Sequence, residues 1–351
     1  MARYRALIPG VTGVVGRRLA EHLAASPEWD VIGVARRPPA ASASYRVLAL
    51  DLMDAAACEA VLRPISGITH VLYCARYDHT TRAKEPIEEN LAMLRNVLDA
   101  IEPSAPASKH VHLVQGTKYY GSDLGPFRTP ARESDPRIST PNWYYAQEDL
   151  AIERSRAGRW TWSASRPHGI CDHAPGIARS MAMVIAVYAA IAREQGEPLC
   201  FPGTPGRYHG LYQVTGATLL AKAIAWISTQ PQCAGEGFNV TNGDCFRWAH
   251  VWPRFARFFG MDAGPVRTVR LAEAMKDKGP VWERVVSRHG LQPTPFGQAA
   301  LWPYADFIFT PGYDMVSDTL KLRRAGFAEC ADSEEMFLGL FERFRRDRII
   351  P

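Results

Sequence analysis

The segment Ala6-Leu-Ile-Pro-Gly10-Val-Thr-Gly13-Val-Val-Gly16 decides the fold, because it sets three evenly spaced glycines directly behind a short apolar run. Glycine permits a tight turn, a close approach of the backbone to a pyrophosphate, and the packing of a helix against a strand. A helix that starts there presents free N–H groups to phosphates. With a strand before it and a helix after it, the segment predicts dinucleotide binding rather than a merely structural turn. The turn residues expected to hold the cofactor are Gly10, Thr12, Gly13, Val14, Val15 and Gly16.

Apolar runs and helical patterns alternate along the first half of the chain. Strands are predicted at 6–8, 31–35, 45–50, 69–75, 110–114 and 160–165, and helices at 16–25, 87–101 and 141–156. This alternation is typical of right-handed βαβ units, which form a parallel sheet covered on both faces. The predicted fold class is therefore α/β, with a Rossmann-type doubly wound parallel sheet.

The pattern changes after Pro167. Residues 238–241 are expected to form a last strand of the sheet, and helices are predicted at 249–259, 271–288 and 333–346. We expect these helices to form a smaller, mainly helical substrate lobe at the carboxyl edge of the sheet. The predicted limits are a dinucleotide-binding domain at 1–172, with 207–244 returning to it, and a substrate-binding lobe at 173–206 and 245–351.

The composition is that of a chain able to bury a large core, with 351 residues of which 47% are hydrophobic. The net charge of +5 is not gathered into a run of like charges, which favours a small anionic ligand over nucleic acid. Seven cysteines are scattered singly, so we expect reduced thiols and no metal site. The longest uncharged helical stretch is shorter than the roughly 20 residues that a bilayer requires, and the first residues lack a signal-peptide pattern. We therefore expect a cytoplasmic protein without a membrane partner, and a homodimer stays open.

The end of the second predicted strand indicates which dinucleotide binds. An acidic residue there would accept a hydrogen bond from the ribose of NAD, but this sequence has Ala35-Arg36-Arg37. Two guanidinium groups suit a 2′-phosphate, so the predicted cofactor is NADPH/NADP+; the alternative is a pair of solvated surface arginines. Asp51 follows the third strand, where it would contact the adenine or cap a helix. The other cofactor contacts expected after the strands are Leu52, Ala75 and His168.

Two motifs mark the catalytic region, Gln115-Gly-Thr-Lys-Tyr-Tyr-Gly121 after the fifth strand and Asn142-Trp-Tyr-Tyr-Ala-Gln-Glu-Asp149 on the next helix. The glycine-rich turn and the tyrosines look like an extended short-chain dehydrogenase/reductase, although the usual Tyr-x-x-x-Lys is absent. With these motifs the chain resembles the progesterone 5β-reductase/iridoid synthase-like family of NADPH-dependent enone reductases. The resemblance covers essentially the whole chain and departs at Trp143, where the family has Phe, and at His168, where Asn is more usual.

The resemblance implies a catalytic pair, Lys118 and Tyr144, and a small-molecule enone substrate. In such a reduction hydride reaches the β-carbon of an α,β-unsaturated carbonyl, and negative charge develops on the carbonyl oxygen. A Tyr144 hydroxyl can hydrogen-bond this enolate. A Lys118 ammonium would favour the oxyanion, lower the pKa of Tyr144 and hold the nicotinamide ribose. The structural alternatives are a core aromatic ring and a solvated lysine, and Tyr145, turned by about 100° on the helix, is expected to pack.

Two other functions stay open from the sequence. An extended short-chain dehydrogenase that acts on a carbonyl or a sugar nucleotide is disfavoured, because the residues four positions after Tyr144 and Tyr145 are Glu148 and Asp149 rather than lysine. A non-catalytic NADP(H) sensor is disfavoured because both the tyrosine and the lysine are present.

Overall fold

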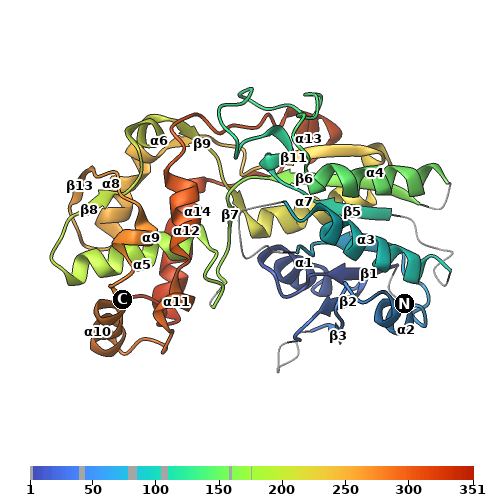
Figure 1. Cartoon of the computed structure of the whole chain (residues 1–351), viewed down its shortest axis with the longest axis horizontal. Helices are drawn as coiled ribbons and strands as arrows, with labels where there is room; N and C mark the ends of the chain where they lie inside the picture. Colours follow the sequence, from blue (N-terminus) through green and yellow to red (C-terminus); the bar gives the residue numbers. More distant parts are fainter. Residues whose placement is uncertain (1–2, 39–43, 78–84, 104–109, 158–159, 175) are drawn as a thin grey trace.

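The computed structural model describes residues 3–38, 44–77, 85–103, 110–157, 160–174 and 176–351. Within these ranges a seven-stranded parallel sheet fills one half of the molecule (Figure 1). Its order is β11-β6-β5-β4-β1-β2-β3, with β1 Tyr4–Pro9, β2 Trp29–Ala35, β3 Arg46–Ala49, β4 His70–Tyr73, β5 His110–Val114, β6 Thr161–Pro167 and β11 Glu236–Val240. The chain winds outward from β1 to β3 and then returns to the other side of β1, which confirms the predicted Rossmann-type fold.

Helices cover both faces of the sheet, because each crossover between parallel strands places a helix against it. One hydrophobic core joins the sheet to α2 Ala55–Leu62, α3 Ile87–Ile101 and α4 Trp143–Arg156. A second core joins the opposite face to α1 Val14–Ala24, α7 Ala217–Thr229 and α13 Leu320–Ala325. In α1 the buried side chains Leu19, Ala20 and Leu23 lie on one stripe of the helix, the pattern of an amphipathic helix on a sheet.

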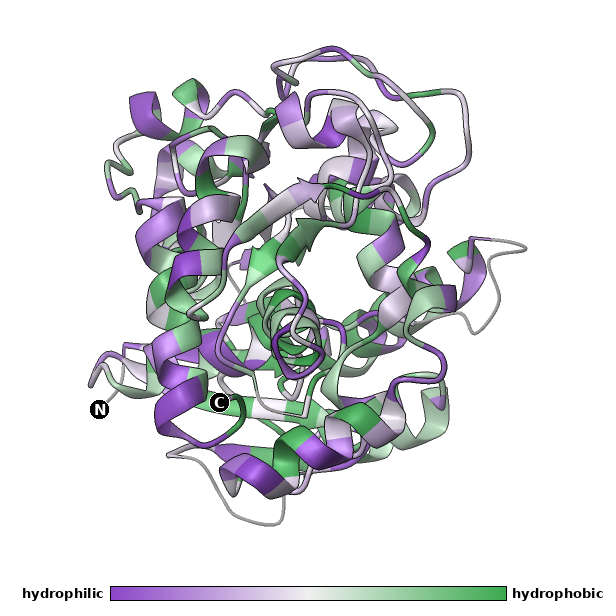
Figure 2. Cartoon of the chain, turned by 90° about the vertical axis from the view of Figure 1, so that its left-hand side faces the viewer, coloured by the Kyte–Doolittle hydropathy of each residue, from purple (hydrophilic) through white to green (hydrophobic). Residues whose placement is uncertain are grey.

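A third core lies beside the sheet and forms what we call the helical lobe. Its centre is α5 Met181–Glu194, which is apolar on every side and buried from Met181 to Ala192. The other helices of the lobe are α6 Pro205–His209, α8 Trp248–Phe258, α9 Leu271–Ala274, α10 Gly279–His289, α11 Phe296–Ala299, α12 Trp302–Phe309 and α14 Ser333–Arg346. Figure 2 looks onto this side of the molecule and shows hydrophobic segments gathered towards the middle, with many hydrophilic ones around them.

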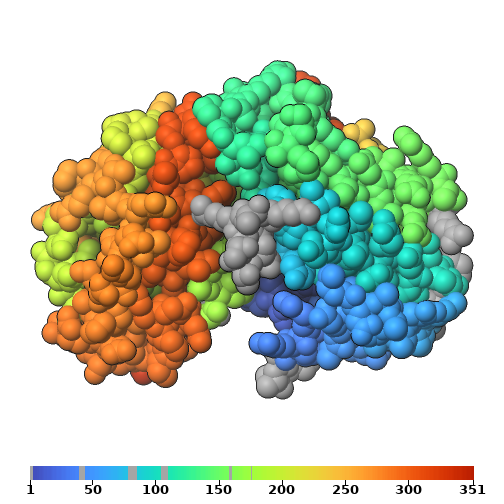
Figure 3. All heavy atoms as spheres, in the orientation of Figure 1, coloured from blue at the N-terminus to red at the C-terminus, as the bar shows by residue number. Residues whose placement is uncertain are grey.

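The chain passes between the sheet and the helical lobe more than once. Figure 3 shows the late segments, orange to red, on one side of the molecule and the early blue segments on the other. Short strand pairs stabilise the connecting segments, namely β7 Ile170–Cys171 with β10 Thr215–Gly216, β9 Leu211–Tyr212 with β12 Phe246–Arg247, and β8 Leu199–Phe201 with β13 Ala263–Val266. The predicted domain limits stay a prediction. They assign 1–172 and 207–244 to the dinucleotide-binding domain, and 173–206 and 245–351 to the lobe.

One predicted helix is divided in the structure, and helices such as α2, α7, α12 and α13 were not predicted. The single helix predicted at 271–288 is wrong, since α9 and α10 are separate helices. Gly279 and Pro280 occupy the first turn of α10, where a proline is tolerated because its missing N–H would have no helical partner. The helices of the described ranges include none that is long and apolar enough to cross a membrane.

Buried histidines run along the middle of the sheet. The two ring nitrogens of His112 lie 2.8 Å from Ser163 Oγ and 3.0 Å from Ser165 Oγ, and His110 Nε2 lies 2.6 Å from the same Ser163 hydroxyl. His112 is fully buried and His110 is 4% exposed. Hydroxyl partners satisfy the imidazoles without an opposing carboxylate, so the folded sheet accommodates these rings in their neutral form.

Candidate active site

The glycine-rich turn between β1 and α1 has the shape expected of a phosphate-binding loop. Gly10 adopts a left-handed φ of +82°, and a Cβ added there would lie 2.6 Å from the backbone nitrogen of Ala75. A Cβ on Gly16 would collide with the carbonyl of Gly10. Gly13 is the N-cap of α1 and therefore offers no side chain to its first N–H groups. The turn itself therefore requires glycine at positions 10 and 16. Gly13 leaves the start of α1 open to an anion.

The residues predicted to select the cofactor lie around this turn. Arg36 and Arg37 follow β2 and are exposed, so their guanidinium groups are accessible. Asp51 is exposed and accepts from the backbone nitrogen of Met53, and Leu52 is buried. The N-cap of α2 is Asp54 rather than Asp51, which removes the helix-cap alternative for Asp51.

Tyr144 lies in the first turn of α4, where Asn142 is the N-cap and accepts from the Tyr144 backbone nitrogen. The ring is 7% exposed and packs against Trp143, with the ring centroids 4.0 Å apart. Its hydroxyl reaches Gly116, since a Cβ built on Gly116 would lie 3.1 Å from that oxygen. The glycine of the Gly-x-Lys motif therefore provides the space that the Tyr144 hydroxyl occupies.

Burial raises the pKa of Tyr144 to about 12, while Arg76 and Arg179 lower it and Glu85 and Asp123 raise it to smaller extents. Desolvation outweighs the nearby cations, so the net shift of the pKa is upward, and the predicted lowering by Lys118 stays a prediction. The side chain is consequently a protonated phenol at neutral pH. A phenol donates a hydrogen bond, which is what an enolate oxygen needs.

Lys118 lies in the 3-10 turn η1 Thr117–Tyr120, directly after β5. Its Nζ is 2.8 Å from Glu85 Oε1 and 3.1 Å from Asp123 Oδ2. Lys118 is therefore a part-buried side chain oriented by two ion pairs, and not a solvated lysine. The same two carboxylates act electrostatically on Tyr144. Lys118 and Tyr144 therefore share one environment at the carboxyl edge of the sheet.

Tyr145 does more than pack. Its hydroxyl lies 2.5 Å from the carbonyl oxygen of Tyr119 and accepts from the backbone nitrogen of Ile138 at 3.1 Å. The ring packs against Tyr119, with the centroids 4.8 Å apart, as predicted, and the hydroxyl adds hydrogen bonds that were not predicted. Both hydrogen-bonding capacities of this hydroxyl are used within the protein.

His168 follows β6 and is buried. Its Nδ1 lies 2.8 Å from Thr117 Oγ1, next to Lys118, and among the described residues Nε2 has no hydrogen-bond partner. Burial lowers the pKa of His168 to about 3, with a smaller contribution from Arg207. The imidazole is therefore neutral and has one nitrogen left for a ligand.

The site includes residues that the sequence analysis did not single out. Arg179 lies over the ring of Tyr304 from the helical lobe, 5.1 Å from its centroid. Arg76 and Arg179 act on Tyr304 as well as on Tyr144, so Tyr304 of α12 and the segment before α5 lie near the start of α4. Contacts between segments so distant in the chain leave no local signal in a single sequence.

Comparison with known proteins agrees with the motifs. Residues 50–351 match the family model of the PRISE-like Rossmann-fold domain. The (S)-8-oxocitronellyl enol synthase ISY1 of Nepeta racemosa is 36% identical over 366 residues, covering 99% of this chain and 93% of that protein. The 3-oxo-Delta(4,5)-steroid 5-beta-reductase of Arabidopsis thaliana is 35% identical over 369 residues, covering 99% of this chain and 93% of that protein.

Solved structures support the fold. A short-chain dehydrogenase/reductase superfamily protein from Agrobacterium tumefaciens with bound NAD superposes with a TM-score of 0.70 at 16% identity, covering 99% of this chain and 98% of that one. The UDP-glucose 4-epimerase of Thermus thermophilus gives 0.65 at 18% identity, covering 97% and 99%. The family prediction made from the two motifs is confirmed, and the chain belongs to the PRISE-like family of Rossmann-fold proteins.

Proposed function

We propose that the protein is an oxidoreductase that reduces the C=C bond of α,β-unsaturated carbonyl compounds with NADPH. The observation that carries the proposal is the position of the Tyr144 hydroxyl, which lies against Gly116, two residues before Lys118. Relatives named for an enol product and for a 5β-reduction of a steroid support the same chemistry.

The residues of the turn fit a dinucleotide. The open start of α1 at Gly13 suits a pyrophosphate, and Arg36 and Arg37 suit a 2′-phosphate. The orphaned Nε2 of His168 suits a polar group of the nicotinamide or of the substrate. When bound, NADPH supplies the hydride for the β-carbon. Solved relatives of the fold with bound NAD support a nicotinamide cofactor in general.

The side chains of this chain supply the electrostatics of the step. Tyr144 donates a hydrogen bond to the carbonyl oxygen, and this bond strengthens as negative charge develops there. The Lys118 ammonium offsets the negative charge of its partners Glu85 and Asp123, which would otherwise disfavour an enolate beside Tyr144. The helical lobe closes the site from the side of Arg179 and Tyr304, and we propose that it binds the rest of the substrate.

Incubation with NADPH and a panel of linear enals, cyclic enones and steroid enones tests the function. Loss of NADPH absorbance with several enones supports it, whereas epimerisation of UDP-sugars in the presence of NAD+ would favour the second candidate, an extended short-chain dehydrogenase. Tight NADPH binding without turnover of any enone would favour the sensor. A cytoplasmic location and a homodimer stay predictions.

The cofactor preference has its own test. Replacing Arg36 and Arg37 together by alanine should weaken NADPH binding by about 1–3 kcal/mol, because charge-assisted hydrogen bonds to the 2′-phosphate are lost. NADH lacks that phosphate and should bind almost unchanged. Fluorescence titration of both cofactors checks this, and equal losses for the two would show that the arginines only support the fold.

A further inference from the structure

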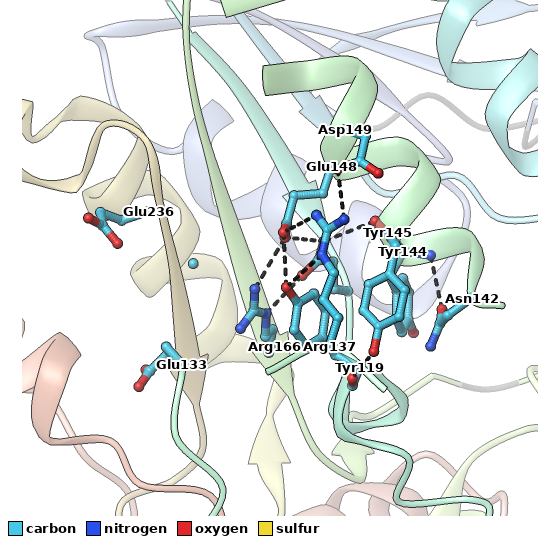
Figure 4. Close-up of polar contacts among 12 residues, drawn as sticks. Tyr119, Glu133, Arg137, Asn142, Tyr144, Tyr145, Glu148, Asp149, Arg166 and Glu236 are labelled. Atoms are coloured by element: carbon cyan, nitrogen blue, oxygen red, sulfur yellow. Dashed lines mark hydrogen bonds and ion pairs between the residues drawn. The ribbon is translucent and has the colours of Figure 1, made fainter. Parts of the chain in front are cut away.

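Glu148 is a buried carboxylate in the middle of α4, one turn after Tyr144. Its side chain is 6% exposed, and Figure 4 shows it pointing towards Arg137 and Arg166. Burial of an unpaired carboxylate is costly, so its partners indicate what the residue does. Among the described residues they are Gln115, Tyr119, Arg137 and Arg166.

The donors to Glu148 fall into two groups. Gln115 Nε2 at 2.9 Å and the Tyr119 hydroxyl at 3.0 Å come from the segment that carries Lys118. Arg137 at 2.8 Å and Arg166 at 3.2 Å supply the opposite charge. Although burial alone would raise the pKa of Glu148, Arg166, Arg137 and the other donors hold it below its usual value. The residue is therefore a carboxylate that ties the Lys118 segment to α4.

The rest of α4 holds the same segment at further points. The Asn142 side chain donates to the carbonyl oxygen of Lys118 at 2.9 Å, and the Tyr145 hydroxyl bonds the carbonyl oxygen of Tyr119. Arg166 stacks on the ring of Tyr119, with its Cζ 3.4 Å from the centroid. All of these contacts involve Lys118 or Tyr119, and they fix the position of the Lys118 turn relative to Tyr144.

We propose that Glu148 is a positioning residue, which fixes the Lys118 turn against the helix that bears Tyr144. The proposal rests on the proposed function for its effect on rate. Glu148 occupies the position at which the motif Tyr-x-x-x-Lys has its lysine. Here the carboxylate at that position orients a lysine from another segment, Lys118.

The test uses Glu148→Gln, which keeps the size of the side chain and removes its charge. The matched control is Asp149→Asn, because Asp149 bonds the same Arg137 but is 61% exposed. In Glu148→Gln the single-turnover rate with NADPH and an enone should fall by about ten- to thirtyfold, the scale of a misplaced catalytic group. In a Lys118→Met background the same substitution should change the rate by less than about threefold, since groups that act as a unit are not additive.

A second readout does not depend on turnover. Reductive methylation of the folded protein, followed by peptide mass spectrometry, reports how accessible the Lys118 amine is. Labelling of Lys118 should be several times faster in Glu148→Gln and unchanged in Asp149→Asn. Unchanged labelling of Lys118 in Glu148→Gln, or an equal rate loss in both backgrounds, would overturn the proposal. Absence of enone turnover by the parent protein would count against the proposed function alone.

If Glu148→Gln does not fold, Tyr119→Phe takes its place. That substitution removes only the hydroxyl that donates to Glu148. Faster labelling of Lys118 in Tyr119→Phe supports the proposal, and labelling equal to that of the parent overturns it.

Discussion

Replacing Tyr144 by phenylalanine should lower the single-turnover rate of enone reduction by roughly 10²–10³, comparable to the loss of one oxyanion donor. The substitution removes the only polar atom of a ring that is otherwise packed against Trp143, so the fold should be retained. NADPH affinity should stay close to that of the parent. The measurement is the single-turnover rate at saturating NADPH.

Tyr145→Phe is the matched control for this prediction, because it removes the same atom from the neighbouring residue. It leaves the Tyr119 carbonyl and the Ile138 amide without their side-chain partner, so the free energy of unfolding should fall by about 1–3 kcal/mol. The rate of the folded variant should fall far less than that of Tyr144→Phe, because Glu148 and Asn142 still hold the Lys118 turn. A slower reaction in Tyr145→Phe than in Tyr144→Phe would show that the catalytic tyrosine has been chosen wrongly.

Acidification should destabilise the protein through the histidines buried in the sheet. Burial lowers the pKa of His112 to about 3 and that of His110 well below 6.5. Below pH 6.5 the unfolded chain takes up protons that the folded sheet cannot, so stability is full above that pH and is lost as the pH falls towards the folded value. At about pH 5 the loss is about 2 kcal/mol for His112, and His110 adds to it in the same direction.

Urea unfolding at about pH 7.5 and about pH 5 measures this loss, within a total stability of about 5–15 kcal/mol. In His112→Gln the side chain can still bond the neighbouring hydroxyls but does not titrate. The difference in unfolding free energy between the two pH values should therefore be smaller in the variant by about 2 kcal/mol. A pH difference equal to that of the parent would show that His112 is not responsible.

The sequence predicted the fold well where the signal is local. The glycine turn, the strand 110–114 and the helices 87–101 and 333–346 have the predicted limits or nearly so, since apolar periodicity decides burial against a sheet. The break between α9 and α10 was missed, although the Gly279-Pro280 pair that starts the second helix is a local signal for it.

The site was predictable only in part. Lys118 and Tyr144 were found from two motifs, but the partners that orient Lys118 were not, since Glu85 lies 33 residues before it and Asp123 lies in the next loop. The upward shift of the pKa of Tyr144 was not predicted, because the extent of burial cannot be read from the motif. The hydrogen bonds of Tyr145 and Glu148 likewise depend on how α4 lies against β5 and η1.

The product formed from a simple cyclic enone shows whether the reduced bond is C=C or C=O. The protein is incubated with NADPH and cyclohexenone, and the product is identified by gas chromatography with mass spectrometry. We expect the saturated ketone, because the Tyr144 phenol stabilises an enolate oxygen while the β-carbon is reduced. An allylic alcohol as the main product would contradict it.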